Sequence, residues 1–172
     1  MLNIMHIRYI FTFLFTLLIT TMSTLCSGVV HENKVTSHTI EIELFLKEHR
    51  LKAVDHLLVP YENSEKVSCF LNKLFQVLSV SSSNRKLDFK TTSNGDGQRL
   101  EITIPSDLRQ SDSVVLDIAY EGCLFEKPIS QEKEDVGETT GTIGEEGVYL
   151  SPACTWYPDI PGSLAVFKIT IT

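Results

Sequence analysis

The imidazole side chains are the first candidates for metal or acid–base chemistry in this chain. Neither an H-E-x-x-H nor an H-x-H pattern occurs, and these are spacings that would bring two ring nitrogens to one metal ion. The sequence therefore predicts ordinary surface or strand-edge histidines and no metal site. Outside the N-terminal apolar run, these histidines are His31, His38, His49 and His56.

Nucleophile and phosphate signatures are also incomplete. Gly162-Ser163 lacks the G-x-S-x-G frame of a nucleophile elbow. Gly95-x-Gly97 and Gly141-x-x-Gly144-x-x-Gly147 are followed by no helical pattern, which a dinucleotide or phosphate loop requires. Nothing in the sequence selects a cysteine–histidine pair, so we expect no catalytic residue in this chain.

Four cysteines occur, and no C-x-x-C pair is among them. If Cys26 leaves with a cleaved leader, three remain, so at most one disulfide forms and one thiol stays free. Cys69 and Cys123 lie in strand-like sequence, and we expect both to be small buried hydrophobic residues, while Cys154 lies in a loop.

Acidic side chains gather in one long segment, Gln131–Gly147, which holds six of them and a single lysine. A calcium loop or a mobile lid is one interpretation, and a solvated surface excursion is the other. The acids do not follow the one-three-five spacing of an EF-hand loop, so the sequence favours the surface excursion.

The aromatic pair Trp156-Tyr157 stands beside Pro158 and close to Pro161. Tryptophan and tyrosine combine a large apolar area with a polar tip, as binding surfaces do. The pair therefore predicts either the rim of a binding surface, for a ligand or a neighbouring domain, or a corner packed on the domain's own core. The sequence leaves both open and favours packing against a neighbouring domain.

The N-terminus resembles an export signal. Arg8 precedes an apolar run from Tyr9 to Ile19, and a small, polar stretch follows to Ser27. We expect 1–27 to be a signal helix that is cleaved, with an uncleaved membrane anchor or a lipid-bearing Cys26 as alternatives. The protein is then exported: periplasmic, extracellular or membrane-anchored.

Charge excludes one class of partner. Arg8 is the only charged residue among the first 27, so the rest holds 14 of the 15 basic side chains and all 22 acidic ones, a balance of −8. Such a surface repels phosphate backbones, and we expect no nucleic-acid partner.

The elements that must position these residues are short strands. Apolar and polar residues alternate over Thr39–Leu46 and again over Leu164–Thr172, which is the period of a half-buried strand. Asn94-Gly95 and Asp96-Gly97 mark a hairpin. After a lead-in at 28–37, residues 38–172 are predicted to form an all-β, antiparallel β-sandwich without helices. The remaining predicted strands are Leu51–Val59, Val67–Leu71, Leu74–Val80, Leu87–Thr91, Arg99–Ile104, Val114–Tyr120 and Val148–Leu150.

The order of several short motifs resembles the N-terminal β domain of the aminopeptidase N (membrane alanyl aminopeptidase) family of zinc metallopeptidases, over about four fifths of the chain. His38–Leu44 is similar to that family's first strand, Gly147–Ser151 to its Gly-x-Tyr turn, and Val166–Ile171 to its F-x-I-T-I strand. Arg99–Pro105 and Leu116–Gly122 resemble the strands between them. The alternating pattern still runs at Thr172, so we expect the domain to be cut near its C-terminal end.

The resemblance implies a saddle-like β domain that does no chemistry, with zinc held by H-E-x-x-H in a downstream domain that this sequence lacks. A peptide substrate and the downstream catalytic domain are the implied partners. The family's substrate-holding Gln is absent from 151–159, which marks a divergent relative. Residues expected to contact substrate or the neighbouring domain are Tyr149, Ser151, Trp156, Tyr157 and Asp159. The alternative is a stand-alone exported binding module that uses the Trp156-Tyr157 surface.

Overall fold

The computed structural model describes residues 34–60, 64–95, 97–109, 112–125 and 140–172. The predicted leader, Cys26, His31 and most of the acidic segment lie outside these ranges. Within them, the helices are single short 3-10 turns, and none is long or apolar enough to cross a membrane.

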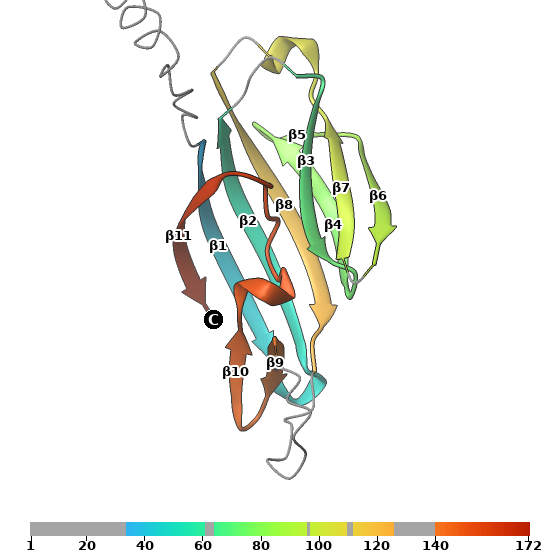
Figure 1. Ribbon diagram of the computed structural model, residues 1–172. Helices are drawn as coiled ribbons and strands as arrows, with labels where there is room; N and C mark the ends of the chain where they lie inside the picture. Colours follow the sequence, from blue (N-terminus) through green and yellow to red (C-terminus); the bar gives the residue numbers. More distant parts are fainter. Residues whose placement is uncertain (1–33, 61–63, 96, 110–111, 126–139) are drawn as a thin grey trace, which may run out of the picture. The chain divides into compact units, whose positions relative to one another are not determined.

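The largest element is a six-stranded sheet in the order β11-β1-β2-β8-β4-β5 (Figure 1). Its neighbouring strands are antiparallel except at one edge, where the last strand runs parallel to the first, with Val35 opposite Leu164. The antiparallel prediction is therefore wrong for this one pair. The bounds are β1 Val35–Phe45, β2 Arg50–Pro60, β4 Phe75–Ser82, β5 Arg85–Lys86, β8 Ser113–Cys123 and β11 Leu164–Ile171.

Two smaller sheets complete the described domain. One has three antiparallel strands in the order β3-β7-β6, and the other is the hairpin β9-β10. Their bounds are β3 Lys66–Asn72, β6 Phe89–Asn94, β7 Gly97–Thr103, β9 Gly141–Gly144 and β10 Gly147–Leu150. The three 3-10 turns are η1 Leu46–Glu48, η2 Ser106–Leu108 and η3 Pro152–Cys154.

The core comes from the alternation that the sequence displays. Along most of β1, β2 and β8 every second residue is buried, while the residues between them face outward. On the three-stranded sheet, β3 and β7 turn Cys69, Leu71, Leu100 and Ile102 into the same core. Burial of each such Leu or Ile side chain is worth about 1.5–3 kcal/mol, so a sandwich-like, all-β domain follows from the pattern.

Most predicted strands are confirmed, and so is the hairpin, where Gly95 has a φ of +61° between β6 and β7. The prediction of irregular structure is wrong for 141–147, because β9, a tight turn and β10 occupy it. The buried interpretation of Cys123 is also wrong. The even-numbered residues Ile118 and Tyr120 of β8 point inward. Cys123 is at an odd-numbered position of the same strand and therefore points outward.

Gly122 makes the close approach of β8 to β4 feasible. A Cβ atom there would meet the carbonyl oxygen of Leu74 and lie 2.8 Å from the Cα of Phe75, both backbone atoms that cannot move aside freely. We expect Gly122→Ala to lower the free energy of unfolding by about 1–3 kcal/mol. Urea denaturation measures this, with Ser79→Ala on the outer face as a control that stays within about 0.5 kcal/mol.

Candidate functional site

The segment between β10 and β11 is pinned across the three-stranded sheet. The Asn72 side chain donates to the carbonyl of Cys154 at 2.9 Å, and the Asn72 backbone N–H donates to that of Thr155 at 2.8 Å. Farther along, Asp159 and Phe70 exchange two backbone hydrogen bonds, of 2.7 and 2.8 Å. Asp159 therefore reaches the sheet through its backbone, as an added bridge beside β3.

This pinning places both predicted aromatic residues inside the domain. Trp156 is 6% exposed and Tyr157 9% exposed. Their rings pack edge to face at 5.2 Å, and Tyr157 meets Phe167 of β11 at 4.9 Å. Burial is the main cause that raises the pKa of Tyr157. Of the two interpretations left open by the sequence, the pair takes the corner packed on the domain's own core.

Ser151 closes the base of the β9-β10 hairpin. Its hydroxyl donates to the carbonyl of Thr140 at 2.7 Å, and its backbone N–H donates to the same oxygen at 3.1 Å. Its own carbonyl accepts from the thiol of Cys154 at 3.1 Å. These contacts hold Ser151 in the local backbone and give it a positioning role in the hairpin.

Tyr149 is the predicted site residue that presents its side chain to the surface, at 54% exposure. With Phe125 and Val148, which are also exposed, it lines an open depression of about 570 Å³ that includes Glu146 on the turn. His49 fixes this corner: its ring nitrogen donates to the carbonyl of Ile143 at 2.5 Å, and its ring lies 4.1 Å from that of Phe125. We call this the hairpin depression. It combines aromatic surface with one carboxylate.

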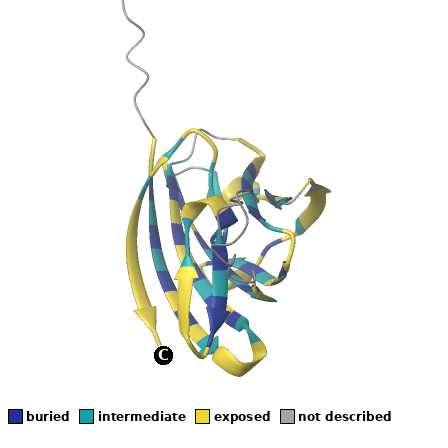
Figure 2. Cartoon of the chain, turned by 60° about the horizontal axis from the view of Figure 1, so that its bottom comes forward, coloured by how far each residue is buried: buried dark blue, intermediate teal, exposed yellow. Residues whose placement is uncertain are grey.

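The second exposed apolar surface is β11 itself, which forms an edge of the large sheet (Figure 2). Phe167, Ile169 and Ile171 continue the inner-face rows of β1 but remain substantially exposed. On the outer face, Leu164 and Val166 are exposed as well. We call these five residues the terminal-strand patch. Exposed apolar side chains along an open sheet edge mark a place where another polypeptide binds.

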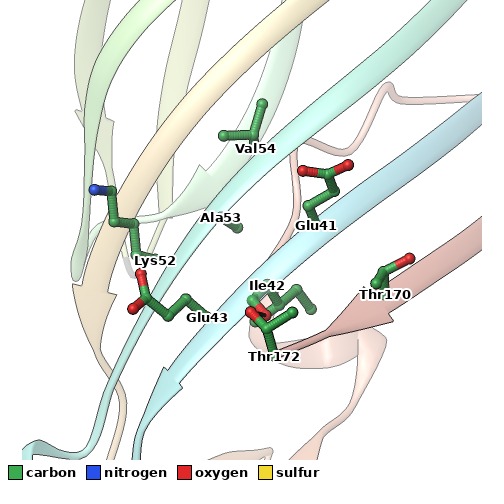
Figure 3. A pocket seen from close by; sticks show the side chains of 8 residues that line it. All are labelled: Glu41, Ile42, Glu43, Lys52, Ala53, Val54, Thr170 and Thr172. Carbon is green, nitrogen blue, oxygen red and sulfur yellow. Dashed lines mark hydrogen bonds between the residues drawn. The ribbon is translucent and has the colours of Figure 1, made fainter.

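A hollow lined by both charged and aliphatic side chains lies on the outer face near the same edge (Figure 3). It measures about 370 Å³ and is lined mainly by outward-facing residues of β1, β2 and the end of the chain. Glu43 and Lys52 are direct cross-strand partners there. Such opposite charges stabilise the sheet by about 0.2–1 kcal/mol, and the hollow gathers no set of groups for chemistry.

Sequence reasoning missed a buried histidine–carboxyl hydrogen bond. His38 Nδ1 donates to Asp55 Oδ2 at 2.7 Å, with His38 1% and Asp55 0% exposed. The expectation of a surface or edge histidine is therefore wrong for His38. The signal was available: His38 occupies an inner-face position in step with Ile40, and Asp55 does so in step with Leu57.

The described residues do not fit a zinc ion. Nowhere in these ranges do three or more His, Cys, Asp or Glu side chains gather closely enough to hold a metal. The buried pair supplies two such groups, too few for a structural or catalytic zinc, which needs three or four protein ligands.

Thiol accessibility separates the three described cysteines. Cys69 and Cys154 are buried, whereas Cys123 is exposed. Burial raises the pKa of Cys69 to about 12, so its reactive thiolate is scarce at neutral pH. We expect iodoacetamide to alkylate Cys123 at least a hundred times faster than Cys69 in the native protein. Peptide mass spectrometry checks this, and equal rates would contradict the burial.

The fold has solved structural relatives, whereas the sequence matches no family model. No protein-family model and no curated protein sequence matches the chain. Among solved structures it is similar to the M1 zinc metallopeptidase from Deinococcus radiodurans, with a TM-score of 0.58 and 18% identity over 81% of this chain and 31% of that one.

A mutant of that metallopeptidase bound to a Tyr-Ser-Ala substrate gives a TM-score of 0.58 at 17% identity over 81% of this chain and 32% of that one. Leukotriene A4 hydrolase from Saccharomyces cerevisiae gives 0.52 at 13% over 83% and 24%. At such identities the likeness shows a shared fold, and it agrees with the predicted resemblance. The chain spans at most about a third of the length of these enzymes.

Proposed function

We propose that this chain is the non-catalytic N-terminal domain of an exported aminopeptidase N-like zinc metallopeptidase. In this role it supports a downstream catalytic domain and shapes one wall of the substrate cleft. The observation that carries the proposal is the fold, which four fifths of this chain share with part of an M1 zinc metallopeptidase. Zinc and the catalytic groups belong to the downstream domain.

The exposed apolar surfaces supply the contacts that this role needs. The terminal-strand patch offers Phe167, Ile169 and Ile171 to a neighbouring domain. Burying three such side chains contributes several kcal/mol at about 25 cal/mol per Å², enough to hold two domains together within one polypeptide. In this proposal, Trp156 and Tyr157 support the interface from beneath, through the contact of Tyr157 with Phe167.

The hairpin depression is the proposed wall of the cleft. Tyr149 presents an aromatic ring, and Glu146 lines the same hollow with a carboxylate that attracts positive charge. A peptide with an apolar side chain and a free amino group suits this combination. In the full-length enzyme we expect Tyr149→Ala to raise KM severalfold and to change kcat little, because the ring binds substrate without touching the reacting atoms.

The test begins with the gene and its product. Sequencing past the codon for Thr172 and measuring the mass of the native protein should reveal a product larger than 19.4 kDa that contains H-E-x-x-H. That product should hydrolyse aminoacyl p-nitroanilides and lose activity with a zinc chelator. A stop codon after Thr172, with no zinc motif in the neighbouring genes, would overturn the proposal and favour a stand-alone exported binding module.

A further inference from the structure

A chain of buried polar groups links β11 to the centre of the large sheet. Thr36 Oγ1 donates to the carbonyl of Leu164 at 3.2 Å and lies 3.5 Å from His38 Nε2. The other ring nitrogen of His38 contacts Asp55. The contacts therefore run from the first residue of β11, through two neighbouring inward positions of β1, to β2.

The imidazole ring of His38 also packs against a side chain of β11. Phe167 of β11 stacks on it with ring centres 4.9 Å apart and planes 19° from parallel. The ring of Tyr157 packs edge to face against the same imidazole, with ring centres 5.4 Å apart. Because both rings pack against the imidazole, any shift of His38 displaces the side chain that anchors the middle of β11.

Burial makes the charge of the pair costly. A neutral imidazole carries one N–H hydrogen. When one further proton is held between His38 and Asp55, the pair is neutral overall. Loss of that proton leaves a carboxylate with no countercharge in the core, where Asp55 Oδ1 has no hydrogen-bond partner within the described structure. The folded domain therefore retains a proton that the unfolded chain releases.

The neighbouring elements add further titratable groups around the pair. Tyr120 of β8 and Cys69 of β3 both interact with the Asp55 carboxylate across the core. Asp159 acts on Cys69 and Tyr157, which adds negative charge on the same side. His56 interacts with Asp55 from the outer face of β2, where it is paired with Asp117.

We propose that the buried His38–Asp55 pair is a proton-operated latch that holds β11 against β1 while it keeps its shared proton and loosens β11 when that proton is lost. The latch concerns the seating of β11 within this domain and does not depend on the proposed metallopeptidase role. It would make the terminal-strand patch pH-sensitive whatever partner covers it.

The direction follows from linkage. Burial is the largest cause that raises the pKa of Asp55, with the contact to His38 acting against it. A carboxyl whose pKa is raised by folding contributes stability that is fully present below its unfolded pKa and is lost as the pH rises through the folded one. β11 is thus seated most firmly below the ordinary carboxyl pKa of 3.8 and loosens as the pH rises through the raised pKa of Asp55.

Hydrogen exchange of the full chain tests the latch. The peptide that covers β11 should lose protection by tenfold or more between pH 4 and pH 8, a range that opens at the ordinary carboxyl pKa of 3.8, after correction for the intrinsic exchange rate. One linked proton permits at most about tenfold per pH unit. The peptide that covers β8 should lose at least threefold less, because the proposed change is local to the edge strand.

Two variants separate the latch from general pH effects. Asp55→Asn keeps an acceptor for His38 but cannot ionise, so β11 protection should vary less than threefold across the same range. Asp117→Asn alters the exposed pair His56–Asp117, whose atoms lie 2.6 Å apart on the outer face, and should retain the full loss. Either β11 protection in the parent protein that does not change with pH, or equal losses in β11 and β8, would overturn the proposal even if Asp55→Asn failed to fold.

Discussion

Replacement of Trp156 by alanine is expected to lower the free energy of unfolding by about 3–5 kcal/mol. The indole is buried and packs edge to face on Tyr157. The surrounding backbone cannot collapse into the space it leaves, because Asn72 holds Cys154 and Thr155 before it and Phe70 holds Asp159 after it. Since globular domains are stable by only about 5–15 kcal/mol, such a loss leaves the variant near its unfolding threshold at room temperature.

Far-UV circular dichroism in urea is the suitable measurement, because Trp156 is the only tryptophan and its loss removes the fluorescence signal. Tyr149→Ala is the matched control, an aromatic truncation on the exposed hairpin that we expect to cost under about 1 kcal/mol. If both substitutions cost the same small amount, the packed position of Trp156 would be refuted.

Replacement of His38 by alanine is the second large effect, again about 3–5 kcal/mol. The substitution removes the partner of a fully buried carboxylate and the ring against which Phe167 and Tyr157 pack. The deficit should shrink as the pH is lowered, because protonation of Asp55 removes the unpaired buried charge.

The chain provides an internal control for this result. His56 and Asp117 form a pair of nearly the same length, 2.6 Å, on the exposed outer face of β2 and β8. His56→Ala should cost only about 0.2–1 kcal/mol, since water solvates the remaining carboxylate. A double variant without His38 and Asp55 should be more stable at alkaline pH than His38→Ala alone, and the opposite order would contradict the ion-pair argument.

The strand pattern could be predicted because alternation is local. The period of two over Ile40–Leu44 and over Val114–Tyr120 depends on which face each side chain takes, and that is visible in the sequence. The same alternation, continued along β8, places Cys123 on the outward face. The hairpin at Asn94–Gly97 followed from residues that accept positive φ values.

Partner choice could not be predicted in this way. Nothing in Leu164–Ile171 specifies that β11 pairs with β1, because the hydrogen-bond partner of a strand depends on the whole sheet. β9 was missed because four residues with two glycines carry too little alternation. The burial of Trp156 depends on backbone contacts between Asp159 and Phe70, which leave no trace in side-chain type. Of the five residues predicted to contact substrate or a neighbouring domain, Tyr149 is the exposed one, and the contact roles of all five stay predictions.

The parallel pairing of β1 with β11 has a consequence for synthesis on the ribosome. β1 emerges first and gains β2 as a neighbour almost at once, but its other edge waits for a strand that lies roughly 130 residues farther along the chain. At about 5–20 residues per second, translation leaves that edge uncovered for roughly 6–26 s. The nascent domain therefore carries an open β-edge through most of its synthesis, and this edge is the first place where a chaperone would act or a second nascent chain would add a strand.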